Sequence, residues 1–167
     1  MGPWLHHLKL LAVWGIIGAL VFVAFQTLEK KRKRTQFQAH GEVVDIQRGD
    51  DGHYHWPGTI NGHAVEFLID TGATGTALSA SLSKKLKLEP IGEVESSTAG
   101  GVVTGQLVRA DIVLQGGVRV DSLRVVALPA LGDHPLLGMD VLGRLRWQQH
   151  DGVLSFDLRE RPPPKGD

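Results

Sequence analysis

Phe67-Leu68-Ile69-Asp70-Thr71-Gly72-Ala73-Thr74 is an apolar run that ends on a carboxylate, which a small hydroxyl residue and a glycine follow directly. A second fragment, Pro135-Leu136-Leu137-Gly138-Met139-Asp140, begins 65 residues after Asp70. Taken alone, Asp70 fits a turn aspartate that bonds its own backbone, because Asp and Gly are common in turns. The apolar strand before the triplet and the second fragment at this distance together favour a functional loop over a simple turn.

The two fragments resemble the active-site loop and the later apolar-apolar-Gly element of retropepsin-like aspartic proteases. The resemblance extends over Tyr54 to Leu158, most of the chain beyond the basic run at 30–34. It implies an all-β fold, a small closed acid-protease barrel with one or two short helices. It also implies a catalytic residue, Asp70, with supporting residues in its loop (Thr71, Gly72, Ala73 and Thr74) and below the loop (Leu136, Leu137 and Gly138).

The resemblance gives these residues distinct roles. Gly72 would supply a backbone N–H close to the carboxylates, where a Cβ would block the approach. The two leucines would pack below the loop, and Gly138 would allow a tight turn. Ala73 lacks a hydroxyl that could favour the ionised carboxylate, so activity is expected to extend nearer to neutral pH. Asp140 is interpreted as a helix cap or a structural hydrogen-bond partner.

Only one Asp-Thr-Gly triplet occurs in the chain, and no Asp-Ser-Gly. In the mechanism that the resemblance implies, two carboxylates share one proton across a bound water, which attacks the peptide carbonyl. One aspartate per chain can supply this pair only at a two-fold axis. The sequence therefore predicts a homodimer that acts on polypeptide substrates and needs no cofactor.

Ala99-Gly100-Gly101 separates two strand-like runs, 93–98 and 102–114. Retropepsin-like enzymes cover their substrate with a glycine-rich hairpin, the flap, at this place between the active loop and the apolar-apolar-Gly element. Glycine permits positive φ at such a tip and a close approach to a peptide backbone. An ordinary hairpin loop remains the alternative for these three residues.

Short strand-like runs and turn signals divide the rest of the chain. Residues 35–52 are expected to be a polar linker with a first strand at 41–47, and 53–158 the protease domain. Asn61-Gly62 and Asp151-Gly152 predict hairpin turns. Ser79 is expected to cap a helix through about Leu86. Residues 159–167 contain three consecutive prolines and are expected to be a disordered tail.

The N-terminal residues 1–34 read as a membrane anchor with a basic flank. Residues 10–25 carry no charge, and residues 8–28 carry only Lys9, which can extend to the interface. A membrane-crossing helix needs about 20 residues. A cleavable signal peptide is the alternative, but no small-x-small cleavage site follows the apolar run. We therefore expect a single-pass protein of a bacterial inner membrane that contacts the bilayer through residues 8–28.

The sequence leaves open on which side of the membrane the protease domain lies. The run Lys30-Lys31-Arg32-Lys33-Arg34 is interpreted as a stop-transfer flank, with specific anionic-lipid binding as the alternative. The positive-inside rule places such a flank, and the domain that follows it, in the cytoplasm. Some membrane-anchored bacterial members of the family act in the periplasm, so the resemblance also allows the opposite side.

Composition narrows the choice of partners. The chain has no cysteine, so disulfides and thiolate metal sites are excluded. Residues 35–167 hold twelve Lys or Arg and seventeen Asp or Glu, a balance that argues against a nucleic-acid partner. His53, His55 and His63 cluster before the active strand, but no acidic residue stands beside them at metal-ligand spacing, and His134 is isolated. No metal site is therefore assigned.

Two functions fit these observations. The first is a membrane-anchored homodimeric aspartic endopeptidase. The second is a catalytically inactive protease-like domain that serves dimerisation or peptide binding. The intact Asp70-Thr71-Gly72-Ala73 favours the first, because an inactive module has no need to keep a carboxylate that its twin in the dimer repels.

Overall fold

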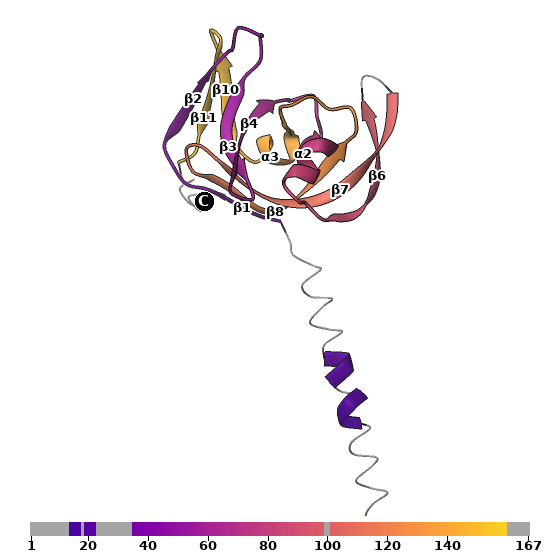
Figure 1. Cartoon of the computed structure of the whole chain (residues 1–167). Helices are drawn as coiled ribbons and strands as arrows, with labels where there is room; N and C mark the ends of the chain where they lie inside the picture. The colour runs from indigo at the N-terminus through magenta and orange to yellow at the C-terminus, as the bar shows by residue number, and fades with distance from the viewer. Residues whose placement is uncertain (1–13, 18, 23–34, 99–100, 160–167) are drawn as a thin grey trace, which may run out of the picture. The chain divides into compact units, whose positions relative to one another are not determined.

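The computed structural model describes residues 14–17, 19–22, 35–98 and 101–159 (Figure 1). It divides into two units, Met1–Arg34 and Thr35–Asp167. In the first unit, residues 14–17 and 19–22 are helical. Most of the expected anchor lies outside the described residues, and among those described no helix is long and apolar enough to cross a membrane. The anchor therefore stays a prediction.

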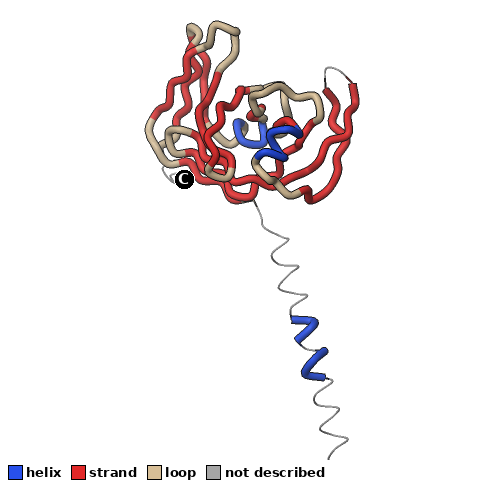
Figure 2. The backbone as a smooth tube through the Cα atoms, in the orientation of Figure 1, coloured by secondary structure: helices blue, strands red, loops and turns tan. Residues whose placement is uncertain are grey.

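The second unit is built mainly of strands, with two short helices among them (Figure 2). The strands are β1 Gln36–Ala39, β2 Val43–Gln47, β3 His55–Ile60, β4 His63–Ile69, β5 Ala77–Ser79, β6 Pro90–Thr98, β7 Gly101–Leu114, β8 Val118–Leu128, β9 Leu136–Leu137, β10 Arg146–His150 and β11 Val153–Asp157. The helices are α2 Ala80–Lys85 and α3 Met139–Leu142.

Eight strands form one sheet in the order β1-β8-β5-β9-β4-β3-β7-β6, and β8 also pairs with β7. This extra pairing closes the strands from β8 to β7 into a ring, so β1 and β6 are left as edges. A second sheet of three strands has the order β10-β11-β2. Figure 1 shows this small sheet and the β6–β7 hairpin at opposite ends of the unit. The expected all-β closed fold is confirmed.

Local turn chemistry agrees with the sequence. Asn61 and Gly62 join β3 to β4 with φ values of 49° and 81°, and Asp151 and Gly152 join β10 to β11 with 48° and 76°. Positive φ at both central residues is the pattern of a tight hairpin turn that Asn-Gly and Asp-Gly favour. Ser79 caps α2 as expected, because its side chain accepts a hydrogen bond from the backbone N–H of Leu82 at 3.2 Å.

The interpretation of residues 35–52 as mainly a linker needs correction. The segment contributes two strands rather than one, because β1 pairs with β8 and β2 pairs with β11. These partners lie 79 or more residues away in sequence, so local composition gave no sign of them. Of the expected disordered tail, only Arg159 belongs to the described residues.

The core joins the two sheets. Trp56 of β3, Phe67 of β4 and Phe156 of β11 are fully buried. The rings of Trp56 and Phe156 lie 4.2 Å apart, and the indole N–H of Trp56 donates to the backbone oxygen of Gln115 at 2.8 Å. Trp56 and Phe67 face each other across the β3–β4 pair, so their chain neighbours His55 and Glu66 lie on the opposite face of this hairpin.

Candidate active site

Asp70 follows directly on the last residue of β4, at the start of an exposed loop. Its backbone N–H donates to the oxygen of Leu137 at 3.1 Å, which ties the start of the loop to β9. The N–H of Gly72 donates to Asp70 Oδ1 at 2.9 Å. A Cβ added at Gly72 would lie 3.2 Å from the same oxygen, tighter than usual. Glycine at 72 therefore suits a close backbone approach to the carboxylate.

The Gly72–Asp70 hydrogen bond is common to both interpretations of Asp70. A turn aspartate accepts a bond from the residue two positions later, and so does the carboxylate of the expected active loop. The distinction lies in the surroundings of the loop. Thr71, Gly72 and Thr74 are exposed, and Ala73 is partly buried. The loop thus presents its tip to solvent while its ends are fastened to distant parts of the chain.

The loop is held from below by the second fragment. β9 pairs in parallel with β4, where Leu68 faces Leu136 and Ile69 faces Leu137. Leu137 is fully buried. The N–H of Met139 donates to the oxygen of Ala73 at 2.8 Å, so the loop is bonded to this fragment at both of its ends.

Gly138 permits an unusually close backbone contact. A Cβ on this residue would overlap the carbonyl group of Gly75 and lie 2.9 Å from its Cα. Such a contact cannot be relieved by rotating a side chain, because its partner is backbone. The structure therefore places Leu136, Leu137 and Gly138 beneath the loop. The catalytic assignment of Asp70 itself stays a prediction.

Asp140 is a structural hydrogen-bond partner rather than a helix cap. Its carboxylate accepts from the Thr76 hydroxyl at 2.8 Å and from the Thr76 N–H at 3.0 Å. Gly138, not Asp140, occupies the N-cap position of α3. Thr76 is buried and also accepts from the N–H of Gly138 at 3.3 Å. These bonds join the end of the active loop to the start of α3.

The expected flap falls on the β6–β7 hairpin, whose residues 99–100 lie outside the described residues. Gly101 opens β7 with φ of 110°, a conformation that favours glycine. Thr98 at the end of β6 pairs with Gly101 at the start of β7. The role of Ala99, Gly100 and Gly101 as a substrate cover stays a prediction.

The structure also gathers polar residues that sequence reasoning missed. His55 lies beside Glu66, and Glu66 lies beside His134. Asp51 accepts from the N–H of His53 at 3.0 Å and bonds His55 at 2.8 Å. These two bonds lower the pKa of Asp51, the backbone bond most. The register of the β3–β4 hairpin could have revealed His55 and Glu66 as diagonal neighbours. His134 lies just before β9 and reaches them because β9 pairs with β4, a pairing that the sequence does not show.

Comparisons with known proteins agree with this geometry. The family described as "gag-polyprotein putative aspartyl protease" matches residues 56–144. A solved retropepsin-like aspartic protease from Rickettsia conorii is 21% identical with a TM-score of 0.55, over 74% of this chain and 93% of that one. A Sinorhizobium protein, described as an uncharacterized protein in the cobV 5′ region, is 29% identical over 119 residues. That match covers 69% of this chain, which spans about half (51%) of the relative's length.

Proposed function

The chain belongs to the retropepsin-like aspartic protease family, and we propose that it is a membrane-anchored homodimeric aspartic endopeptidase. The observation that carries the proposal is the setting of Asp70. Its carboxylate accepts a backbone N–H in an exposed loop, and hydrogen bonds at 3.1 Å and 2.8 Å fasten that loop to β9 and α3. A rigidly held carboxylate at a surface loop is what a shared two-carboxylate site requires.

The proposed chemistry uses one Asp70 from each chain. Two carboxyl groups about 3 Å apart cannot both ionise, so the pair holds a single proton and titrates as a unit. The ionised carboxylate takes a proton from the water that lies between the two groups. The protonated carboxyl donates to the scissile carbonyl oxygen as the water attacks its carbon. The backbone N–H of Gly72 supports the carboxylate without needing to move.

Dimerisation is supported by the single Asp-Thr-Gly triplet and by the exposure of the loop. Thr71, Gly72 and Thr74 are open to solvent in the single chain and thus accessible to a second copy. Met139, whose N–H bonds the loop, is 38% exposed and offers apolar surface beside it. A membrane anchor would assist this association, because it raises the local concentration of the chains.

The anchor and its orientation rest on composition. Residues 8–28 carry a single charge, and the basic run at 30–34 follows. By the positive-inside rule this run favours a protease domain on the cytoplasmic side. Digestion of spheroplasts with an external protease tests the orientation, since a periplasmic domain would be degraded and a cytoplasmic one protected.

The activity is tested with Asp70→Asn. The full-length chain in detergent is incubated with an unstructured protein, and cleavage is followed with and without pepstatin. Asn is nearly isosteric but cannot exchange the proton, so hydrolysis should fall by about 10²–10⁴-fold. Asp50→Asn, at an exposed aspartate in the turn between β2 and β3, is the matched control. Equal rates for the wild type and Asp70→Asn would refute the catalytic assignment. Binding without cleavage by the wild type would support the inactive peptide-binding module.

Shared catalysis is tested by dilution. Each site needs two chains, so the rate should fall more steeply than linearly as the protein is diluted. A mixture with excess Asp70→Asn protein should lose activity further through mixed dimers. Strict proportionality between rate and concentration in a sample that light scattering shows to be monomeric would contradict the dimeric site.

A further inference from the structure

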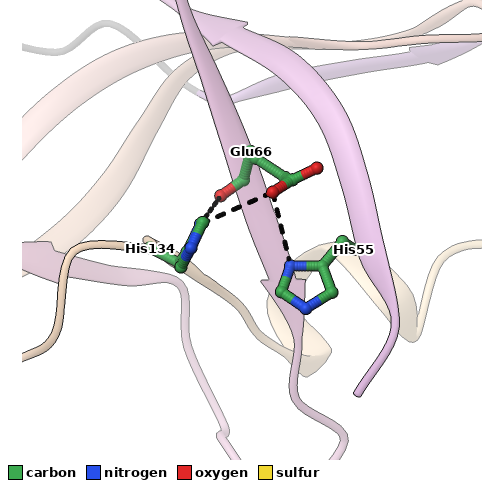
Figure 3. A group of neighbouring side chains, drawn as sticks. All are labelled: His55, Glu66 and His134. Atoms are coloured by element: carbon green, nitrogen blue, oxygen red, sulfur yellow. Dashed lines mark hydrogen bonds and ion pairs between the residues drawn. The ribbon is translucent and has the colours of Figure 1, made fainter. Parts of the chain in front are cut away.

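His55 of β3, Glu66 of β4 and His134 of the segment before β9 converge on one face of the β3–β4 hairpin (Figure 3). Each residue offers one ligand atom, and the three atoms lie within 4.8 Å of one another. We propose that these residues bind a divalent transition-metal cation of the zinc class. This site is separate from the Asp70 loop, and the inference does not depend on the proposed protease activity.

The distances between the groups suit a shared cation. Glu66 Oε2 lies 3.6 Å from His55 Nδ1 and 3.8 Å from His134 Nδ1. Both separations are too long for direct hydrogen bonds. Two ligands of a tetrahedral zinc ion lie roughly 3.4 Å apart, given metal–ligand bonds of about 2.0–2.2 Å. Only small side-chain shifts are therefore needed to close the three groups around one ion.

His55 is prepared for a metal by its second ring nitrogen. Nε2 lies 2.8 Å from Asp51 Oδ2, and an ionised carboxylate can only accept, so Nε2 carries the hydrogen. The lone pair on Nδ1 then faces Glu66. Nδ1 is buried and has no hydrogen-bond partner among the described residues. A carboxylate that holds the outer nitrogen of a histidine is the usual support of a metal-binding imidazole.

His134 is also held in place. Its Nδ1 lies 3.2 Å from the backbone oxygen of Glu66, which places the ring beside the carboxylate. Because a carbonyl oxygen only accepts, Nδ1 carries a hydrogen in this contact and has to give it up when it binds the ion. The rings of His55 and His134 stand nearly perpendicular, at 76°, with centroids 5.3 Å apart. The side chains of Glu66 and His134 are 49% exposed, which gives an ion access from solvent. Three protein ligands leave a fourth position for water.

The position of the site suggests that the cation holds three chain segments together. The N–H of Leu68 donates to the oxygen of Pro135 at 2.8 Å, next to His134 in the chain. Leu68 also pairs with Leu136. An ion bound here would join β3, β4 and the start of β9. β4 leads into Asp70 and β9 supports its loop, so we expect the metal to raise stability.

Binding is tested on the full-length chain in detergent, purified without a polyhistidine tag and stripped with a chelator. Zn²⁺ is titrated by calorimetry, and Co²⁺ absorption reports nitrogen and oxygen ligands. We expect one ion per chain and a melting temperature that rises with Zn²⁺ concentration. Asp51→Asn should weaken binding by about 10–100-fold, and His134→Ala or Glu66→Gln by more. His150→Ala, at an exposed histidine beside Asp151, should not change it.

Nuclear magnetic resonance on the wild-type protein tests the same site without a substitution that could disturb the fold. Long-range ¹H–¹⁵N spectra should show Zn²⁺-induced shifts of the His55 and His134 ring nitrogens and none for His150. Absence of Zn²⁺ binding, or equal affinity in the wild type, Glu66→Gln and His134→Ala, would overturn the proposal.

Discussion

The loop that carries Asp70 and the β6–β7 hairpin lie on the same domain but are held in opposite ways. The loop is bonded to residues about 65 positions away through Asp70–Leu137, Ala73–Met139 and Thr76–Asp140 contacts. Among the described strands, β6 is an edge strand whose sheet partner is β7 alone. β7 pairs with β8 only from Gln106 onward, so residues 101–105 depend on β6.

Exposure follows the same division. Leu137 and Gly138 below the loop are buried, whereas Ile91 and Val102 on the hairpin are 48% and 69% exposed. A two-stranded ribbon is marginally stable on its own, and a loop bonded at both ends resists displacement. The Asp70 carboxylate is therefore held by many contacts, whereas the β6–β7 hairpin, the proposed substrate cover, has few.

The largest effect is expected from Gly138→Ala. The new Cβ would overlap the backbone of Gly75, which cannot move aside without displacing the active loop. Overpacking of this kind costs about 1–3 kcal/mol, and backbone overlap belongs at the upper end. Urea unfolding measures the loss. Gly132→Ala is the control, since nothing lies within 4 Å of a Cβ there. Equal midpoints for the two variants would show that the loop is not tightly held.

Thr76→Val should have a smaller effect on the same region. The change keeps the shape of the side chain but removes the 2.8 Å bond to Asp140 and the acceptor of the 3.3 Å bond from the Gly138 N–H. It leaves a partly buried carboxylate with one partner fewer. A loss of about 1–2 kcal/mol in unfolding free energy is expected, below the loss for Gly138→Ala. Thr104→Val makes the same change at an exposed position of the hairpin and should stay within about 0.5 kcal/mol. Similar losses at both positions would remove the contrast between the regions.

Val102→Ser tests the hairpin. Since Val102 is 69% exposed, unfolding free energy should change by no more than about 0.5 kcal/mol. If the hairpin covers the substrate, KM for a quenched fluorescent peptide should rise while kcat changes less. Val43→Ser, at a valine of β2 that is 49% exposed, should leave KM unaltered. An unchanged KM in Val102→Ser would indicate that the hairpin takes no part in substrate binding.

The smallest effect is expected at a surface ion pair outside both regions. The Arg159 guanidinium bonds the Asp157 carboxylate at 2.8 Å and, as the main cause, lowers its pKa to about 2. Because the folded pKa is lowered, this stabilisation is present above about pH 4 and is lost as pH falls toward 2. Arg159→Ala should raise the pKa part of the way, since Arg146 remains at 3.1 Å. A ¹³C carboxyl titration measures it, and an unchanged pKa would contradict the assigned cause.

The sequence alone determined the features that depend on neighbouring residues. Asn61-Gly62 and Asp151-Gly152 specify hairpin turns through their tolerance of positive φ, and Ser79 specifies a helix start through its side-chain oxygen. The Asp70 triplet after an apolar strand, with Leu136-Leu137-Gly138 downstream, was enough to indicate the family and the support beneath the loop.

Only the tertiary structure decided the features that depend on distant pairing. β1 and β2 could not be assigned to the domain, because their partners β8 and β11 lie far along the chain. The same holds for the Thr76–Asp140 bonds and for His134 beside His55 and Glu66. Turns and caps are encoded by torsional preferences within a few residues. A polar cluster forms only when strand pairing brings separate segments to one face, and local sequence does not predict such long-range pairing.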